Sequence, residues 1–569
     1  MYSRYRAVAL LTGSAVAMIA AMHTPRAATI LQEAPRPQQA AVILPDSPPA
    51  LALTPSAATD VTLDALSQPG IDQNPLPVII PGQGNPELQA TPQQTPAETQ
   101  KADTASPQPD AAPQPAINLA IRAALTRLAA EPEQPGEKIS AEMRSRRQAV
   151  EAFYAGRNDA PLWFDKGQWT DAAKAAFSRL QRAAEDGLDL HGMKVYSLDK
   201  GSDAALAEGE IALSEAVAAY AFQASGGRVD PARISKLIAA RPQIVDPAHA
   251  LEATAQAADA DATLQGFNPP QPGYLALRTK LAELRADPMP TARVASTDPS
   301  LRIAEAGRRT PIRADRLSGL EPAASKGEER ARQQVEAEIV ANMERWRWLP
   351  RDLGVDHLEV NIPDYEVRLY HGPALAYSTR VVVGKPDTPT PLFSNKMVYL
   401  IVNPSWNVPQ SIIKKEMMPR LAADPNYLKR LGYDVDYENG RLHVRQPPGE
   451  RNALGRIKFM FPNDYAVYLH DTPSRALFAS TRRAFSHGCV RVDQPFDFAQ
   501  AVLGPDKGWS EARMKKLIGG KERTVFLPES LPIHLVYFTV AVDESGNLRQ
   551  SEDIYGYSRK VRSLLGLQG

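Results

Sequence analysis

Prolines are distributed very unevenly along this chain, and that unevenness restricts where a folded domain can form. The chain has 569 residues and 50 prolines, and 17 of those prolines lie within residues 29–115. Proline lacks a backbone N–H and has a fixed φ, so a proline-dense stretch builds neither a regular helix nor a central strand. The residues between these prolines are mostly small or polar and show no apolar period that could offset the entropy of ordering. We therefore predict that residues 29–115 are a disordered, extended spacer.

The segment before the spacer, residues 1–28, is typical of an export signal. Two arginines within residues 1–6 precede an apolar run over 7–22, and small residues follow at 27–28. The run is shorter than the about 20 residues of a membrane-spanning helix. We expect a cleaved signal peptide or, as the alternative, an uncleaved anchor at the periplasmic face of the inner membrane. Both alternatives predict a periplasmic protein.

Charge and cysteine content exclude several classes of function. Lys+Arg and Asp+Glu both number 65, so the formal net charge is zero and no overall basic field for nucleic acid is expected. The chain has one cysteine, which excludes an intrachain disulfide framework and zinc sites built on two or four cysteines.

Hydrophobic periodicity divides the rest of the chain into a helical part and a part rich in strands, which predicts a multidomain α+β protein. A charged insertion at 409–452 is too long for a routine hairpin loop and is a candidate lid. The boundaries that we predict are an α-helical domain at 116–290, a linker at 291–327, a connecting helix at 328–350 that stops at Pro350, a mainly-β domain at 351–560 and a tail at 561–569.

The single cysteine has neighbours that suggest chemistry. Cys489 follows Ser486, His487 and Gly488, and His470 stands at the end of a strand-like run sixteen residues before Ser486. An imidazole that takes a thiol proton produces a thiolate, which attacks carbonyl carbons. Backbone N–H groups around Gly488 and Cys489 could form an oxyanion hole. This pattern indicates acyl transfer through a thioester.

Two plainer interpretations stay open at this point. A lone cysteine is often a small buried hydrophobe, and a lone histidine is often a structural hydrogen-bonding residue. Against this, a free thiol outside the cytoplasm risks oxidation, so a filler role is a poor use for Cys489. Strand alternation puts Ala466, Tyr468 and His470 on one face, and puts Arg491 on the same face as Cys489. Arg491 is either a structural ion-pair partner or a clamp on a substrate carboxylate.

Residues 470–492 (HDTPSRALFASTRRAFSHGCVRV) resemble the signature of the L,D-transpeptidase catalytic domain, the YkuD-like family. That signature is a histidine, a gap of about fifteen residues, and then Ser/Thr-His-Gly-Cys. The resemblance extends over about 350–560 and implies a YkuD-like catalytic domain. Three segments resemble the large Gram-negative, YcbB-like branch, namely ERWRWLP (344–350), NALGRIKFMFPN (452–463) and SEDIYGYS (551–558). The region 116–290 resembles the scaffold domain of that branch, and 409–452 resembles its capping subdomain.

The resemblance implies a substrate and a set of roles. The substrates are donor and acceptor stem peptides of peptidoglycan, which become joined by 3→3 cross-links with release of D-Ala. Cys489 is the implied nucleophile and His470 the base, with the backbone carbonyl of Asp471 orienting the imidazole. The implied oxyanion site is formed by His487 and Gly488 together with Cys489. The candidate substrate-binding residues are Trp406, Tyr468, Ser486 and Arg491. The family needs no metal or organic cofactor, and carbapenems acylate its cysteine.

One departure and three alternatives accompany this resemblance. The YcbB-like branch carries a small peptidoglycan-binding module, whose pattern is not found in the short, polar segment 291–340. An L,D-carboxypeptidase would form the same thioester and resolve it with water. A sortase-like enzyme would attach a protein through the same chemistry. A non-catalytic wall-binding protein with a relic site would not need both His470 and Cys489.

Overall fold

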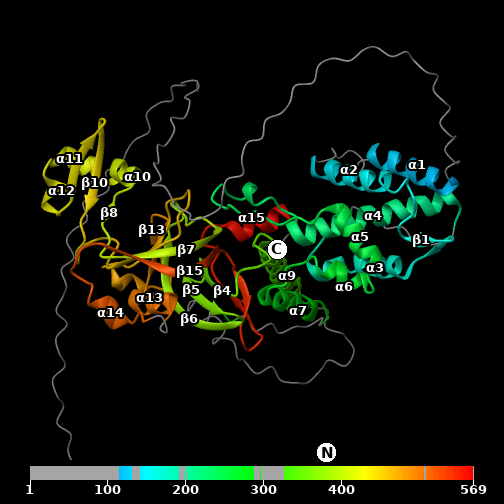
Figure 1. The fold of residues 1–569 in the computed structure, drawn as a ribbon. Coiled ribbons are helices and arrows are strands. Elements are labelled where there is room, and N and C mark those ends of the chain that lie inside the picture. Colours follow the sequence, from blue (N-terminus) through cyan, green and yellow to red (C-terminus); the bar gives the residue numbers. More distant parts are fainter. Residues whose placement is uncertain are drawn as a thin grey trace, which may run out of the picture. The chain divides into compact units, whose positions relative to one another are not determined.

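The described part of the chain lies between residues 115 and 567 and consists of several ranges. The computed structural model describes residues 115–130, 141–190, 198, 201–286, 295–296, 326–504 and 508–567. The predicted signal at 1–28, the spacer up to residue 114 and most of the predicted linker lie outside the described residues. The described residues form a helical region followed by a mainly-β region, which confirms the predicted multidomain α+β class (Figure 1). None of the described helices combines the length and apolar character needed to cross a bilayer.

The helical domain is built around one helix, α4 (Asp203–Gly226), which is buried along most of its length. Its Ala-rich sequence is apolar on every side, so neighbouring helices can pack all round it. This helix lies inside the region 116–290 that the sequence predicts to be α-helical. Five helices contact α4, and they are α1 (Ala116–Ala130), α2 (Ala141–Ala155), α3 (Asp171–Gln181), α5 (Pro247–Gln256) and α6 (Ala260–Gln265). Smaller elements of this region are β1 (Phe164–Asp165), β2 (Gln168–Trp169), η1 (Ala183–Asp186) and η2 (Pro231–Arg233).

Helix α9 (Lys326–Trp346) joins the helical domain to the β domain. One carboxylate oxygen of Glu344 accepts hydrogen bonds from the backbone N–H groups of Arg228 and Val229, at 2.6 and 2.8 Å. The connecting helix predicted at 328–350 corresponds to α9, which starts and ends a few residues earlier than expected. Helix α7 (Pro272–Ala286) packs beside α9.

The β domain is one mixed sheet of nine strands in the order β13-β6-β14-β12-β11-β7-β15-β4-β5. An additional pairing between β5 and β6 closes this sheet on itself around an apolar core. Its strands are β4 (Asp356–Asn361), β5 (Glu366–His371), β6 (Ala374–Gly384), β7 (Phe393–Val402), β11 (Ile457–Met460), β12 (Leu469–His470), β13 (Ala484–Ser486), β14 (Val490–Val492) and β15 (Arg523–Val536).

Helices and small strands cover this sheet. They are α13 (Pro495–Leu503), α14 (Glu511–Lys515), α15 (Tyr557–Leu564) and η4 (Arg475–Ala479), with β16 (Val540–Val542), β17 (Leu548–Gln550) and β3 (Ala295–Ser296) forming a separate small sheet. Helix α15 packs on α9. The predicted boundary between the catalytic domain and the tail, at residues 560–561, therefore falls inside a packed helix.

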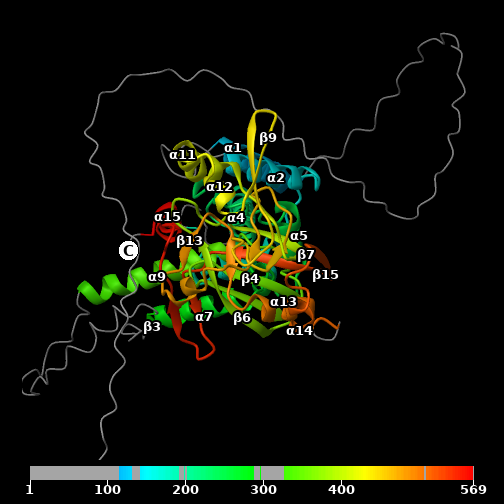
Figure 2. The same ribbon diagram turned by 90° about the vertical axis from the view of Figure 1, so that its left-hand side faces the viewer.

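The insertion predicted at 409–452 has its own small core, which includes Ile413, Met417, Leu428 and Val444. Its β9–β10 hairpin projects away from the sheet (Figure 2). The elements of this part are β8 (Trp406–Asn407), α10 (Gln410–Ile412), the π-helical turn η3 (Ile413–Met417), α11 (Met418–Ala423), α12 (Tyr427–Arg430), β9 (Asp434–Glu438) and β10 (Arg441–Gln446). A separate core means that this insertion packs as a small unit of its own.

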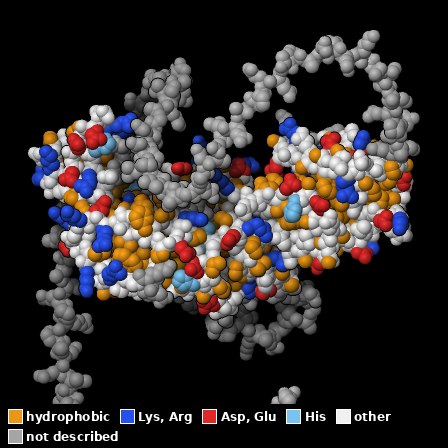
Figure 3. Space-filling view, viewed as in Figure 1, with side chains coloured by type: hydrophobic (Ala, Val, Ile, Leu, Met, Phe, Trp, Pro, Cys, Tyr) orange, Lys and Arg blue, Asp and Glu red, His pale blue; other side chains and the backbone are white. Residues whose placement is uncertain are grey.

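Acidic and basic side chains alternate over the face shown in Figure 3. This mixture matches the equal numbers of acidic and basic residues in the sequence.

We predict that Phe459→Ala destabilises the β domain by about 3–5 kcal/mol, because Phe459 is fully buried on β11 and its removal leaves a cavity. Urea unfolding followed by tryptophan fluorescence measures the loss. Phe526→Ala is the matched control, since Phe526 is 67% exposed on β15 and its removal should cost about 0.5 kcal/mol or less. Equal losses for the two variants would contradict the assigned core.

Candidate active site

Two short strands that are far apart in the sequence, β12 and β14, pair in parallel at the centre of the site. The register places His470 opposite Arg491. One step earlier, the Val490 N–H donates to the Tyr468 carbonyl oxygen over 3.1 Å, so Tyr468 lies beside Cys489. Because side chains alternate along a strand, Tyr468, His470, Cys489 and Arg491 share one face of the sheet.

Strand β11 adds to this face a basic residue that the sequence analysis did not single out. It pairs antiparallel with β12 and places Lys458 opposite His470. Lys458, His470 and Arg491 therefore form one line across three neighbouring strands, which we call the basic row. Phe459 and Leu469, adjacent to row members in the chain, are fully buried in the core, so the row lies on the opposite face.

The imidazole of His470 is buried and held in one orientation. Its Nδ1 lies 2.5 Å from the backbone carbonyl oxygen of Asp471. A carbonyl oxygen only accepts, so Nδ1 carries the proton and Nε2 keeps a lone pair. Burial, followed by the charges of Arg491 and Lys458, lowers the pKa of His470 to about 3. The ring is therefore a neutral base at neutral pH.

The carboxylate of Asp471 holds the backbone that orients His470. It accepts hydrogen bonds from the N–H groups of Arg456 and Thr472, at 2.7 and 2.5 Å. Gly455, at φ +61°, leaves room for this carboxylate, since a Cβ there would lie 2.3 Å from Asp471 Cγ. Burial raises the pKa of Asp471, against the opposing effect of these bonds. The family resemblance implied a role only for the backbone of Asp471.

The thiol of Cys489 lies just before β14 and is partly buried. Its Sγ is 3.9 Å from the carbonyl oxygen of Ala466, a residue with the positive φ of +52°. Burial raises the pKa of Cys489, while hydrogen bonds from the backbone N–H and the hydroxyl of Tyr468, and the charge of Lys458, act in the opposite direction. The thiol is thus protonated at rest, with donors already in place for a thiolate.

The loop before Cys489 is fixed by the hydroxyl of Ser486. Ser486 Oγ donates to the Cys489 carbonyl oxygen and accepts from the Gly488 N–H at 3.1 Å. The Gly488 N–H therefore has an acceptor within the loop, and its role as an oxyanion donor stays a prediction. Gly488 has φ +116°, where a side chain would be strained, and Thr390 Oγ1 donates to its carbonyl oxygen. Among the described residues, the Cys489 N–H has no acceptor, which leaves it free for an oxyanion.

The side chain of His487 contacts the insertion. Its Nε2 lies 2.6 Å from Oε1 of Glu416, which sits in the π-helical turn η3 of the insertion. The imidazole therefore connects the cysteine loop to the insertion, and the expected place of His487 at the oxyanion site stays a prediction.

Trp406 and Tyr468 connect the insertion to the site in a second way. The Trp406 side chain donates a hydrogen bond to the Tyr468 hydroxyl, and burial raises the pKa of that hydroxyl. Trp406 lies on β8, which pairs with β10. Tyr468 therefore contacts Cys489 directly, and Trp406 contacts the site through Tyr468.

Arg491 is partly buried, and among the described residues no carboxylate forms an ion pair with it. Burial lowers its pKa, and the only opposing influence is Cys489. The ion-pair interpretation of Arg491 therefore lacks a partner, and the substrate-clamp interpretation remains.

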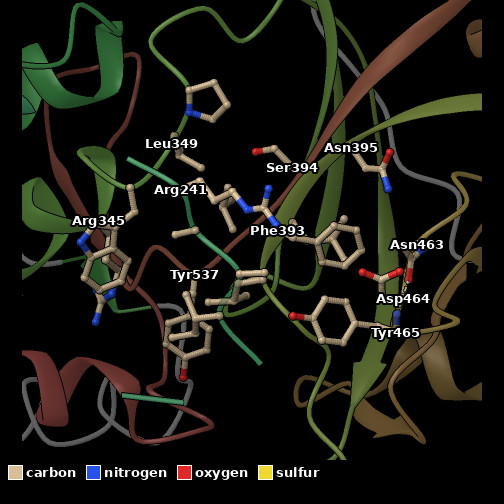
Figure 4. A pocket seen from close by; sticks show the side chains of 18 of the residues that line it. Arg241, Arg345, Leu349, Phe393, Ser394, Asn395, Asn463, Asp464, Tyr465 and Tyr537 are labelled. Carbon is tan, nitrogen blue, oxygen red and sulfur yellow. Dashed lines mark hydrogen bonds between the residues drawn. The ribbon is translucent and has the colours of Figure 1, made fainter. Parts of the chain in front are cut away.

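A cavity of about 460 Å³ lies close to this site without containing it. Arg241 enters it from the helical domain and points toward Phe393 at the start of β7, and Tyr465 points into it from the other side (Figure 4). Tyr465 directly precedes Ala466, whose carbonyl oxygen faces Cys489 Sγ. Tyr465 therefore lines this cavity, whereas His470, Cys489 and Arg491 do not. Within the described residues, no group of three or more His, Cys, Asp or Glu side chains could hold a metal ion.

Two protein families match this chain. Residues 355–518 match the family described as L,D-transpeptidase catalytic domain, and residues 148–281 match the family described as Scaffold domain. A curated Haemophilus influenzae protein described as "Putative L,D-transpeptidase" is 34% identical over 245 residues, covering 40% of this chain and 49% of the relative. The chain thus spans about half the length of the curated relative that it matches. The predicted resemblance to the L,D-transpeptidase family is confirmed.

Solved structures of low similarity were also found. An L,D-transpeptidase from Mycobacterium smegmatis is 12% identical with a TM-score of 0.19, and covers 32% of this chain and 58% of that chain. A cysteine-to-serine mutant of the Enterococcus faecium L,D-transpeptidase is 17% identical with a TM-score of 0.15, and covers 32% of this chain and 50% of that chain. TM-scores this low carry no weight, and the assignment rests on the family matches.

We predict that alkylation of Cys489 by iodoacetamide accelerates only as pH rises into the alkaline range. Its raised pKa keeps the thiol protonated at neutral pH, and the lowered pKa of His470 prevents a resting thiolate–imidazolium pair. Rates between about pH 5 and pH 10 can be read by intact mass, since Cys489 is the only cysteine. A step below about pH 7 that disappears in His470→Ala would contradict this resting state.

Proposed function

From the membership of residues 355–518 in the L,D-transpeptidase catalytic-domain family, we propose that this protein joins peptidoglycan stem peptides by 3→3 cross-links through a cysteinyl thioester. The observation that carries the proposal is the fixed imidazole of His470. His470 lies on β12, which pairs with β14, and the register and side-chain alternation put it on the same face as Cys489. A general base in one tautomer next to a nucleophile is the arrangement that covalent acyl transfer requires.

The first step forms the thioester. Sγ of Cys489 attacks the carbonyl carbon at the L-centre of the third residue of the donor, while Nε2 of His470 takes the thiol proton. The carbonyl oxygen becomes an oxyanion that the Cys489 N–H can receive. The C–N bond to D-Ala then breaks, and the imidazolium returns the proton to the leaving amine. The carbonyl of Asp471 holds Nδ1–H throughout, so the ring does not need to reorient.

The second step releases the enzyme. The side-chain amine of an acceptor stem peptide attacks the thioester carbonyl and gives its proton to Nε2. The new amide bond forms as the C–S bond breaks, and the thiolate recovers the proton from the imidazolium. The donors around Sγ, the N–H and hydroxyl of Tyr468, stabilise the departing thiolate.

Two alternatives differ only in the acceptor. Water would make the protein an L,D-carboxypeptidase, and a protein amine would make it an attaching transpeptidase of the sortase kind. The insertion favours a peptide acceptor, because it is attached beside the thiol through Glu416 and Trp406 and can exclude water from the thioester. A non-catalytic wall-binding protein with a relic site would not need a base that is oriented on the same face as its cysteine.

The same proposal assigns a location and partners. The segment typical of an export signal supports a periplasmic protein, either released or anchored to the inner membrane. Its partners are then the donor and acceptor stem peptides. The mechanism written above uses side chains and backbone groups of this chain and requires no cofactor.

We predict that a carbapenem forms a one-to-one covalent adduct at Cys489. The thiol should open the β-lactam ring as it would attack a donor amide, and intact-mass spectrometry should show the added mass of one carbapenem. Cys489→Ala is the control and should show no gain. An unmodified wild-type mass, or a gain that persists in Cys489→Ala, would refute the nucleophile.

We predict that His470→Ala lowers the rate of 3→3 dimer formation from disaccharide-tetrapeptides by about 10²–10⁴-fold, the usual contribution of a general base. Chromatography with mass spectrometry quantifies the dimers. Thermal unfolding should change little if the role is chemical. Hydrolysed tripeptide without dimers from the wild type would favour the carboxypeptidase, and a wild-type rate in the variant would remove His470 from the mechanism.

A further inference from the structure

The body of the insertion has very few polar contacts with the rest of the protein. Its small apolar core, which includes Ile413 and Leu428, contains no residue of the nine-stranded sheet. The backbone of β10 pairs with β8 at the base of the insertion. Apart from that pairing, one contact joins residues 409–445 to other described residues by a hydrogen bond or ion pair, and it is the contact of Glu416 with His487. A single side-chain pair therefore connects the insertion to the loop that carries the nucleophile.

The local backbone directs Glu416 toward this loop. Ile413 and Met417, at the two ends of the π-helical turn, are buried in the core of the insertion, whereas the side chain of Glu416 is about half exposed and reaches His487. Because a carboxylate only accepts hydrogen bonds, Nε2 of the imidazole is the donor. Turns of this kind are rare and are frequently found at functional sites. The histidine stands two residues before Cys489, so the contact ends next to the thiol.

The strength of this pair fits a latch better than a structural support. The side chains of His487 and Glu416 are 36% and 51% exposed, and ion pairs of this exposure contribute at most about 1 kcal/mol. Losing such a pair does not unfold the insertion, since its core remains. The same free energy is enough to change the ratio of two positions of the insertion about five-fold, which corresponds to about 1 kcal/mol.

We propose that Glu416 is a positioning residue which, by binding His487, holds the insertion against the cysteine loop while the thioester awaits its acceptor. This inference rests on the proposed function, because it takes Cys489 to form a thioester. Water can attack a thioester through any opening, whereas an acceptor stem peptide is placed by contacts along its length. Holding the insertion in position therefore slows hydrolysis more than it slows attack by the amine, and it favours cross-linking.

The ratio of hydrolysed tripeptide to 3→3 dimer tests this inference, because both products arise from the same thioester. With disaccharide-tetrapeptide as the only substrate of the full chain, chromatography with mass spectrometry measures both products. Glu416→Ala should raise the ratio about five-fold, the shift expected for an exposed ion pair. Glu438→Ala is the matched control, since it removes an exposed glutamate of β9 that forms no ion pair among the described residues, and it should change the ratio less than about two-fold.

Exchanging the two charges separates this contact from a general structural effect. Glu416→Arg alone and His487→Glu alone should each raise the ratio, since each removes the attraction. The two substitutions together restore an ion pair of opposite polarity and should return the ratio to within about two-fold of the wild type. Slower thioester formation caused by His487→Glu cancels in the ratio. A double variant whose ratio equals the product of the two single effects would overturn the inference.

Hydrogen exchange measured by mass spectrometry reports on the contact without turnover. The backbone amides of residues 410–423 should exchange faster in Glu416→Ala and at the wild-type rate in the charge-exchanged variant. Unchanged exchange, an unchanged product ratio, or an equal loss of both products in Glu416→Ala would overturn the inference.

Failure of the proposed function is distinguishable from failure of this inference. A wild-type protein that yields tripeptide and no dimer would lose the proposed transpeptidation, and the inference would be kept if hydrolysis is faster in Glu416→Ala and overturned if it is not. A protein that forms dimers at an unchanged ratio in Glu416→Ala would keep transpeptidation and lose the inference. A protein that yields neither product would lose both.

Discussion

The parallel pairing of β12 with β14 is the contact on which the site depends. It aligns His470 with Arg491 and brings Tyr468 beside Cys489, although nineteen positions of chain separate the histidine from the cysteine. The chain between them must return to the same end of the sheet, since parallel strands cannot be joined by a tight turn. The strands are short, so their alignment is maintained by the buried residues behind them and by the carboxylate of Asp471.

Polar groups at this site are stabilised by backbone contacts more than by charge pairs. His470 is held by a carbonyl oxygen, Cys489 faces the N–H of Tyr468, and Gly488 is fixed by the hydroxyls of Ser486 and Thr390. Such contacts constrain geometry without supplying a counter-charge. Burial, followed by the positive charges of Arg491 and Lys458, keeps the imidazole of His470 neutral.

The insertion contacts residues of the site in addition to those of the sheet. Glu416 reaches His487 from the π-helical turn, a kind of irregularity often found at functional positions, and Trp406 reaches Tyr468 from β8. The first contact ends on His487, two residues before Cys489, and the second ends on Tyr468, which is hydrogen-bonded to the thiol. A movement of the insertion would thus be transmitted directly to the residues that border the thiol, which gives it the position expected of a lid.

The sequence by itself predicted the α+β class and the resemblance to the L,D-transpeptidase family, and it named Cys489 and His470 as candidate catalytic residues, because composition, periodicity and a short motif are local properties of the chain. It also indicated the backbone of Asp471 through the family resemblance. Only the tertiary structure decided that Lys458 joins the site, that His487 turns to Glu416, and that Ser486 occupies the Gly488 N–H. Ile457 and Phe459 alternate with Lys458 and Met460 along β11, but this pattern does not determine which strand pairs beside Lys458. Strand order, register and the partners of buried polar groups depend on contacts between distant segments, which no local pattern encodes.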